Sequence, residues 1–220
     1  MAVLVDTRRG TTYAKPLLRG WLHLVWFEAS LVAGTLLAVA AQGVRQSVAV
    51  AVYAACLSGL FGVSALYHRG TWGPLARAVL QRADHTMILL LIAGTATPVL
   101  LLGVPDRFGL VGLVVLWSLT AVGIVVRLAR MDAPEWLVGG TFLGLGGINT
   151  LAIPLLWTSA GAAEALLVVV GGLLYVAGAV AYHHRRPDPF PRVFGYHEVF
   201  HAFVCAAATC HFVAIALLLR

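Results

Sequence analysis

The polar residues that could do chemistry lie at the ends of long apolar segments. Ser64 and His68 are spaced i, i+4 at the end of one segment, and His197 and His201 have the same spacing at the start of another. Side chains at i and i+4 lie on one face of a helix, so each pair can point at a common centre. Asp84 opens a third apolar segment. Ionisable groups in such segments indicate a functional site, and these groups are of metal-binding types.

Three imidazoles are enough to hold a catalytic zinc ion, because such sites use three protein ligands and leave the fourth position to water. We therefore predict that His68, His197 and His201 bind Zn2+. Other divalent ions also bind imidazole, so the spacing alone does not select the metal. Cys205, four residues after His201, is a minor candidate for an extra ligand.

The segment from His197 to His201 also reads H-E-x-x-H, a motif in which Glu198 would be the general base of a metalloprotease. The extended motif needs glycine at position 204 and histidine at position 207, where Val204 and Ala207 stand. No aspartate or glutamate follows Glu198, so a downstream carboxylate ligand is missing. The context of the motif therefore disfavours proteolysis.

The composition is that of a membrane protein. Of 220 residues, 60% are hydrophobic and 11% charged, with a mean hydropathy of +0.91, whereas a soluble domain has about 25% charged residues. The net charge of +6 does not indicate a nucleic-acid partner, because the arginines lie in short loops between apolar runs. The three cysteines lie inside apolar runs, which makes a disulfide framework improbable.

Seven apolar segments approach the roughly 20 residues that a spanning helix needs. They cover residues 20–42, 47–68, 84–103, 109–129, 136–157, 162–182 and 196–219. We expect an all-α, seven-transmembrane helix bundle in the cell inner (plasma) membrane. Pro98 and Pro154 lie inside spans and should bend them. Five glycines between residues 139 and 147 predict close helix packing.

The distribution of lysine and arginine predicts the orientation. The N-terminal segment and the even-numbered connections carry 12 of these residues, and the opposite side carries 3. Positive residues collect on the cytoplasmic side, so the N-terminus is expected in the cytoplasm and the C-terminus outside. Residues 1–19 then form a cytoplasmic segment and residues 20–220 the membrane domain. All the candidate ligands, and Asp84, fall at cytoplasmic ends of spans.

At these residues the chain resembles the hemolysin III family of the progestin and adipoQ receptor superfamily, whose relatives include the adiponectin receptors and, more distantly, alkaline ceramidases. The resemblance follows family order and covers nearly the whole chain. It is carried by KPLLRGWLH (15–23), SALYHR (64–69), DHTMILLLIAGTATP (84–98), RPDPF (186–190) and FGYHEVFH (194–201). Ala96 departs from the family pattern, in which an aromatic residue is expected.

The resemblance implies a seven-helix bundle with zinc bound by His68, His197 and His201. It implies that Asp84 and Ser64 lie beside the water on the zinc. In the receptor branch the implied chemistry is slow hydrolysis of a ceramide-like lipid amide. We therefore expect a zinc-dependent hydrolase of lipid amides or related acyl lipids, with membrane lipids as partners and a lipid or fatty acid in the bundle interior.

Alternatives stay open at this point. Asp84 could take a proton from water, hold the water, or be a fourth zinc ligand. The protein could also be a sensor of membrane state or a signalling protein, in which zinc is structural and a bound lipid biases helix packing. A pore or transporter would need a polar path across the whole membrane, and the gathering of polar residues at one depth disfavours it.

Overall fold

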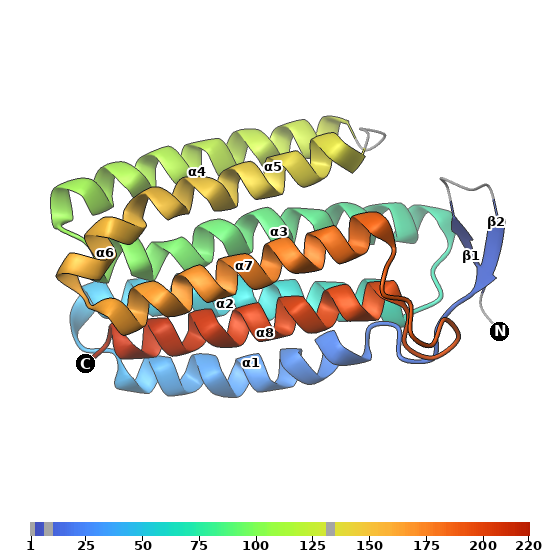
Figure 1. Ribbon diagram of the computed structural model, residues 1–220, viewed down its shortest axis with the longest axis horizontal. Helices are drawn as coiled ribbons and strands as arrows, with labels where there is room; N and C mark the ends of the chain where they lie inside the picture. The colour runs from blue at the N-terminus through green and yellow to red at the C-terminus, as the bar shows by residue number, and fades with distance from the viewer. Residues whose placement is uncertain (1–2, 7–10, 131–134) are drawn as a thin grey trace.

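The computed structural model of the chain is an elongated bundle whose helices run side by side (Figure 1). It describes residues 3–6, 11–130 and 135–220. Two short strands, β1 (Val3–Asp6) and β2 (Thr11–Ala14), pair antiparallel ahead of the first helix. The helices that follow are α1 (Trp21–Ala40), α2 (Gly43–Arg69), α3 (Pro74–Leu102), α4 (Asp106–Ala129), α5 (Glu135–Ile148), α6 (Ile153–Ser159), α7 (Ala162–His184) and α8 (Tyr196–Leu217). A 3-10 turn, η1 (Asn149–Ala152), joins α5 to α6.

Seven helical segments in the described ranges are long and apolar enough to cross a membrane, with α5, η1 and α6 together supplying the fifth. Helices are expected in a bilayer because they satisfy every backbone hydrogen bond within one segment. The predicted all-α, seven-span class is confirmed. The β1–β2 hairpin, which the sequence analysis did not predict, lies outside the spans.

The third span begins earlier than predicted. The apolar run starts near Asp84, but α3 starts at Pro74, which stands in the first helical turn where its missing N–H costs no hydrogen bond. Asp84 is therefore about 15 Å along the helix from its first residue rather than at its start. The prediction failed because the first turns of α3 carry polar residues such as Arg77 and Arg82, which hydropathy does not mark as part of a span.

The helix breakers and glycines behave differently from one another. The bend expected at Pro154 coincides with the 3-10 turn that interrupts the fifth span, whereas α3 continues as one helix through Pro98. The prediction of close helix packing at the five glycines between residues 139 and 147 is wrong, because a methyl group built at any of them meets no described atom within 4 Å. Close approach occurs instead between α2 and α3, where Gly94 faces the side chain of Cys56.

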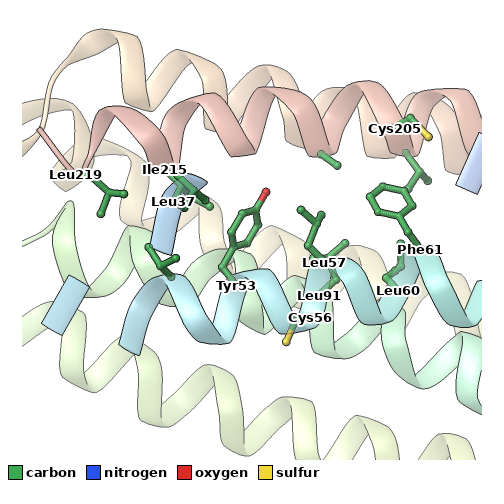
Figure 2. Close-up of a cluster of buried hydrophobic side chains, with 13 residues drawn as sticks. Leu37, Tyr53, Cys56, Leu57, Leu60, Phe61, Leu91, Cys205, Ile215 and Leu219 are labelled. Atoms are coloured by element: carbon green, nitrogen blue, oxygen red, sulfur yellow. The ribbon is translucent and has the colours of Figure 1, made fainter. Parts of the chain in front are cut away.

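The largest apolar cluster joins α2, α3 and α8, with Leu37 added from α1 (Figure 2). Tyr53, Leu57 and Phe61 of α2 are fully or almost fully buried in it, opposite Cys205 and Ile215 of α8. Because lipid tails are as apolar as these side chains, tight packing rather than removal from water holds the helices together. This packing fixes α2 and α8 relative to each other, and these two helices carry the three candidate ligands.

The N-terminal hairpin and the C-terminus lie at opposite ends of the bundle (Figure 1). The hairpin shares its end with the last turn of α2 and the first turn of α8, so His68 and His197 lie there too. Arg45 and Arg107, in contrast, lie in the first turns of α2 and α4 at the other end. An odd number of crossings places the two termini on opposite sides of the membrane. The 12-to-3 distribution of positive residues predicts which terminus is on which side.

We predict that the N-terminus lies in the cytoplasm and the C-terminus outside, because positive residues are retained on the cytoplasmic side. Fusion of a reporter that works only in the cytoplasm, and of one that works only outside, at each terminus should give opposite results at the two ends. Finding both termini on one side would contradict the seven-span topology.

Candidate metal centre

The three predicted histidine ligands lie together at the N-terminal end of the bundle. His68 is in the last turn of α2, and His197 and His201 are in the first two turns of α8. One ring nitrogen from each lies within 4.8 Å of the others. The ring centroids are 4.6 Å apart for His68 and His197, 5.0 Å for His68 and His201, and 4.6 Å for His197 and His201. The i, i+4 spacing on α8 thus directs two imidazoles to the side on which α2 ends.

These imidazoles are short of hydrogen-bond partners. His197 Nε2 and His201 Nδ1 are buried and have no partner among the described residues. A buried polar atom without a partner is costly, so such atoms call for an explanation. Zinc–nitrogen bonds of about 2.0–2.1 Å place tetrahedral ligand atoms about 3.4 Å apart, so small side-chain shifts would bring this group to coordination distance. The donor types, their burial and their spacing all fit a zinc ion.

Asp84 and Ser64 lie beside the histidine cluster rather than within it. Asp84 Oδ2 is 3.8 Å from His68 Nε2, which is too long for a hydrogen bond. Ser64, one helical turn before His68, lies close enough to Asp84 for the two side chains to interact. Asp84 does not belong to the group of donor atoms that lie within 4.8 Å of one another. The carboxylate is therefore placed to contact a water or a substrate next to the cluster.

His23 is a neighbour of the cluster to which the sequence analysis assigned no role. Its ring stacks on that of His201, with centroids 3.7 Å apart and an interplanar angle of 10°. It is 3% exposed, and neither ring nitrogen has a partner among the described residues. A signal was present in the sequence, because His23 begins a span at the same end of the bundle as the predicted ligands.

Glu198 does not have the geometry of a metalloprotease base. Its side chain is 1% exposed. Its Oε2 accepts a hydrogen bond of 2.8 Å from the backbone N–H of Gly195, and its Oε1 accepts one from the guanidinium of Arg19. Both carboxylate oxygens are thus engaged in holding the start of α8, in agreement with the sequence argument against proteolysis.

The remaining candidates lie away from the cluster. Cys205 is not among its donor atoms and packs in the apolar cluster instead, because one further turn of α8 moves a side chain about 6 Å along the axis. His211 Nε2 lies 3.2 Å from the Val168 carbonyl oxygen, as expected of a core hydrogen bond. His85 accepts a hydrogen bond from Arg127. All three cysteines are free thiols.

Comparison with known proteins gives consistent matches. The sequence profile of a family described as "Haemolysin-III related" matches residues 11–212. The chain is 31% identical over 137 residues to a protein of Bacillus subtilis (strain 168) described as "Hemolysin-3 homolog", which covers 62% of each chain. It is 28% identical over 170 residues to "Hemolysin-3" of Bacillus cereus, covering 76% of this chain and 74% of that relative. The chain thus spans just over three fifths of the length of the first relative.

We predict about one zinc ion per purified chain, bound by three imidazoles. His68→Ala, His197→Ala and His201→Ala should each lose most of this zinc, because two remaining ligands hold the ion poorly. His184→Ala, at the exposed end of α7, and His211→Ala, deeper in α8, are matched histidine controls and should retain it. Zinc content is measured by elemental analysis of detergent-purified protein. Full zinc occupancy in the double variant His197→Ala, His201→Ala would rule out this site.

Proposed function

Since the chain belongs to the haemolysin-III related family, we propose that it is a zinc-dependent hydrolase that cleaves ceramide-like lipid amides or related acyl lipids. Its seven apolar helices make it a multi-pass protein of the cell membrane. The observation that carries the proposal is the group of three imidazoles, His201 buried and the other two partly buried, with ring nitrogens within 4.8 Å of one another, beside a carboxylate.

The histidine cluster suits a site that performs chemistry rather than one that only stabilises the fold. Structural zinc sites normally have four protein ligands, whereas catalytic sites have three and keep one position open. Asp84 stands outside the group of donor atoms, which favours the open arrangement. Zinc bound by His68, His197 and His201 would polarise a carbonyl group and make water a nucleophile near neutral pH.

Asp84 and Ser64 have complementary roles in this proposal. The carboxylate of Asp84 takes the proton that the attacking water loses, and later transfers it to the departing amine. The Ser64 hydroxyl, which lies close to Asp84, would donate a hydrogen bond to the carboxylate and keep it turned toward the cluster. Water thereby adds across the amide bond, so that a carbon–oxygen bond forms, the carbon–nitrogen bond breaks, and a fatty acid and an amine are released.

The depth of the cluster fits an acyl lipid. His201 is five residues after the first residue of α8, about 7.5 Å along the axis. The cluster thus lies near one end of the bundle, and the amide or ester bond of a membrane lipid likewise lies near the membrane surface, between the head group and the acyl chain. The side chains below the cluster, such as Phe61 and Leu60, are buried and apolar, so the surroundings of the cluster match an acyl chain in polarity.

We predict that Asp84→Asn retains most of the zinc and loses hydrolysis, because an amide cannot accept the proton. Ser64→Ala should reduce turnover less, since one hydrogen bond to a developing charge is worth at most about 3–4 kcal/mol. Zinc content and single-turnover release of fatty acid are measured on the same preparations, with candidate lipid amides and esters.

Two outcomes would change the proposal. Loss of zinc in Asp84→Asn would make the aspartate a fourth ligand and the site structural. Wild-type protein with full zinc and no release from any amide or ester lipid would contradict hydrolysis and favour a lipid sensor.

A further inference from the structure

We infer that the buried ion pair between Arg19 and Glu198 is a positioning device, which fixes the first turns of α8 so that His197 and His201 face His68. The inference rests on the proposed zinc site but assigns a separate role to residues that do not touch the ion. It also gives a function to the glutamate of the H-E-x-x-H sequence other than that of a base.

Glu198, in the first turn of α8, caps the start of its own helix. Its Oε2 accepts the hydrogen bond from the Gly195 N–H, one of the N–H groups that a helix start leaves without a partner in the helix. Asp188 accepts a second such hydrogen bond, 2.9 Å long, from the N–H of Tyr196. These contacts prevent the first turn from fraying. His197 lies in that turn, next to Glu198 in the sequence, so its direction depends on the cap.

Arg19 ties this turn to the N-terminal end of α1. Arg19 is 5% exposed, and its guanidinium contacts Glu198 Oε1. Four residues later, in the first turn of α1, His23 stacks on His201. Arg19 and His23 thus contact α8 at Glu198 and His201, which lie one turn apart. Two such contacts limit both the rotation of α8 about its axis and its movement along it.

The segment before α1 extends this connection to α2. The backbone N–H groups of Leu17 and Leu18 each donate a 3.0 Å hydrogen bond, to the carbonyls of Arg192 and Val193 just before α8. Lys15 Nζ donates to the carbonyl oxygens of Arg69 and Gly70, at 2.9 and 3.2 Å, at the end of α2. Residues 15–19 therefore join the turn that holds His68 to the turn that holds His197.

Neither partner of the pair can be removed without consequence for the other. A buried arginine whose carboxylate is lost remains as an unpaired charge, which is strongly destabilising locally. Replacing both charged groups by amides removes this charge while keeping a possible hydrogen bond between the side chains. Glutamine at position 198 also retains an oxygen that can accept from the Gly195 N–H. The double variant should therefore recover part of what each single variant loses.

The test compares Glu198→Gln, Arg19→Gln and the double variant with Asp106→Asn. The last breaks an exposed ion pair with Arg45, 2.6 Å long, at the other end of the bundle. Full-length protein is loaded with zinc, and the rate of metal loss to a chelator is measured well below the unfolding temperature. The absorption spectrum of the cobalt-loaded protein reports the ligand geometry independently of hydrolysis.

We expect each single variant to lose zinc about 10- to 100-fold faster than wild type, as is typical when a supporting contact of a metal ligand is removed. Their cobalt spectra should be altered. The double variant should lose zinc more slowly than either single variant, and Asp106→Asn should match wild type. If Glu198→Gln does not accumulate, Arg19→Lys, which keeps the charge but not the planar fork, should show a smaller acceleration.

Four results would overturn the inference. Wild-type zinc loss and an unchanged cobalt spectrum in Glu198→Gln, with hydrolysis abolished, would make Glu198 a base. An equal acceleration of zinc loss in Asp106→Asn would show that the effect comes from a general loss of stability and not from the position of α8. If the wild-type protein binds zinc and the single variants lose it at the wild-type rate, the positioning role alone is overturned. If the wild-type protein binds no zinc, both this role and the proposed function are overturned.

Discussion

A helix that crosses a bilayer fixes the depth of every residue on it, because the backbone in hydrocarbon must satisfy its own hydrogen bonds. Short connections then return the chain to the same end of the bundle after each pair of spans. The last turn of α2 and the first turns of α1 and α8 meet in this way. Residues far apart in the sequence thereby share one depth, and a site can be assembled there without any loop of its own.

Within this frame a buried polar group is stabilised by a partner, and several find one nearby. Glu198 has Arg19 and the backbone of Gly195, and His211 has the carbonyl of Val168. His197 and His201 each keep a buried ring nitrogen without a partner among the described residues. An ion that completes the histidine cluster would give these two ring nitrogens the partner that the described residues do not supply.

The sequence predicted the features that follow from composition and helical spacing. Long apolar runs predicted the seven spans, and the shared end of three of them grouped His68, Asp84 and the histidines of α8. The start of α3 was missed because its first turns are polar and carry no hydropathy signal. The pairing of Arg19 with Glu198 was missed because it depends on which helices are neighbours, and the sequence pattern sets depth but not adjacency.

The contact between the two ends of the chain has a consequence for biosynthesis. Glu198 follows Arg19 by 179 residues, which at about 5–20 residues per second is roughly 10–40 s of translation. During this interval Arg19 has no carboxylate partner on α8. The histidine cluster is completed only when the final helix enters the membrane, so a ribosome that stalls before α8 leaves an inserted protein with neither the ion pair nor the cluster.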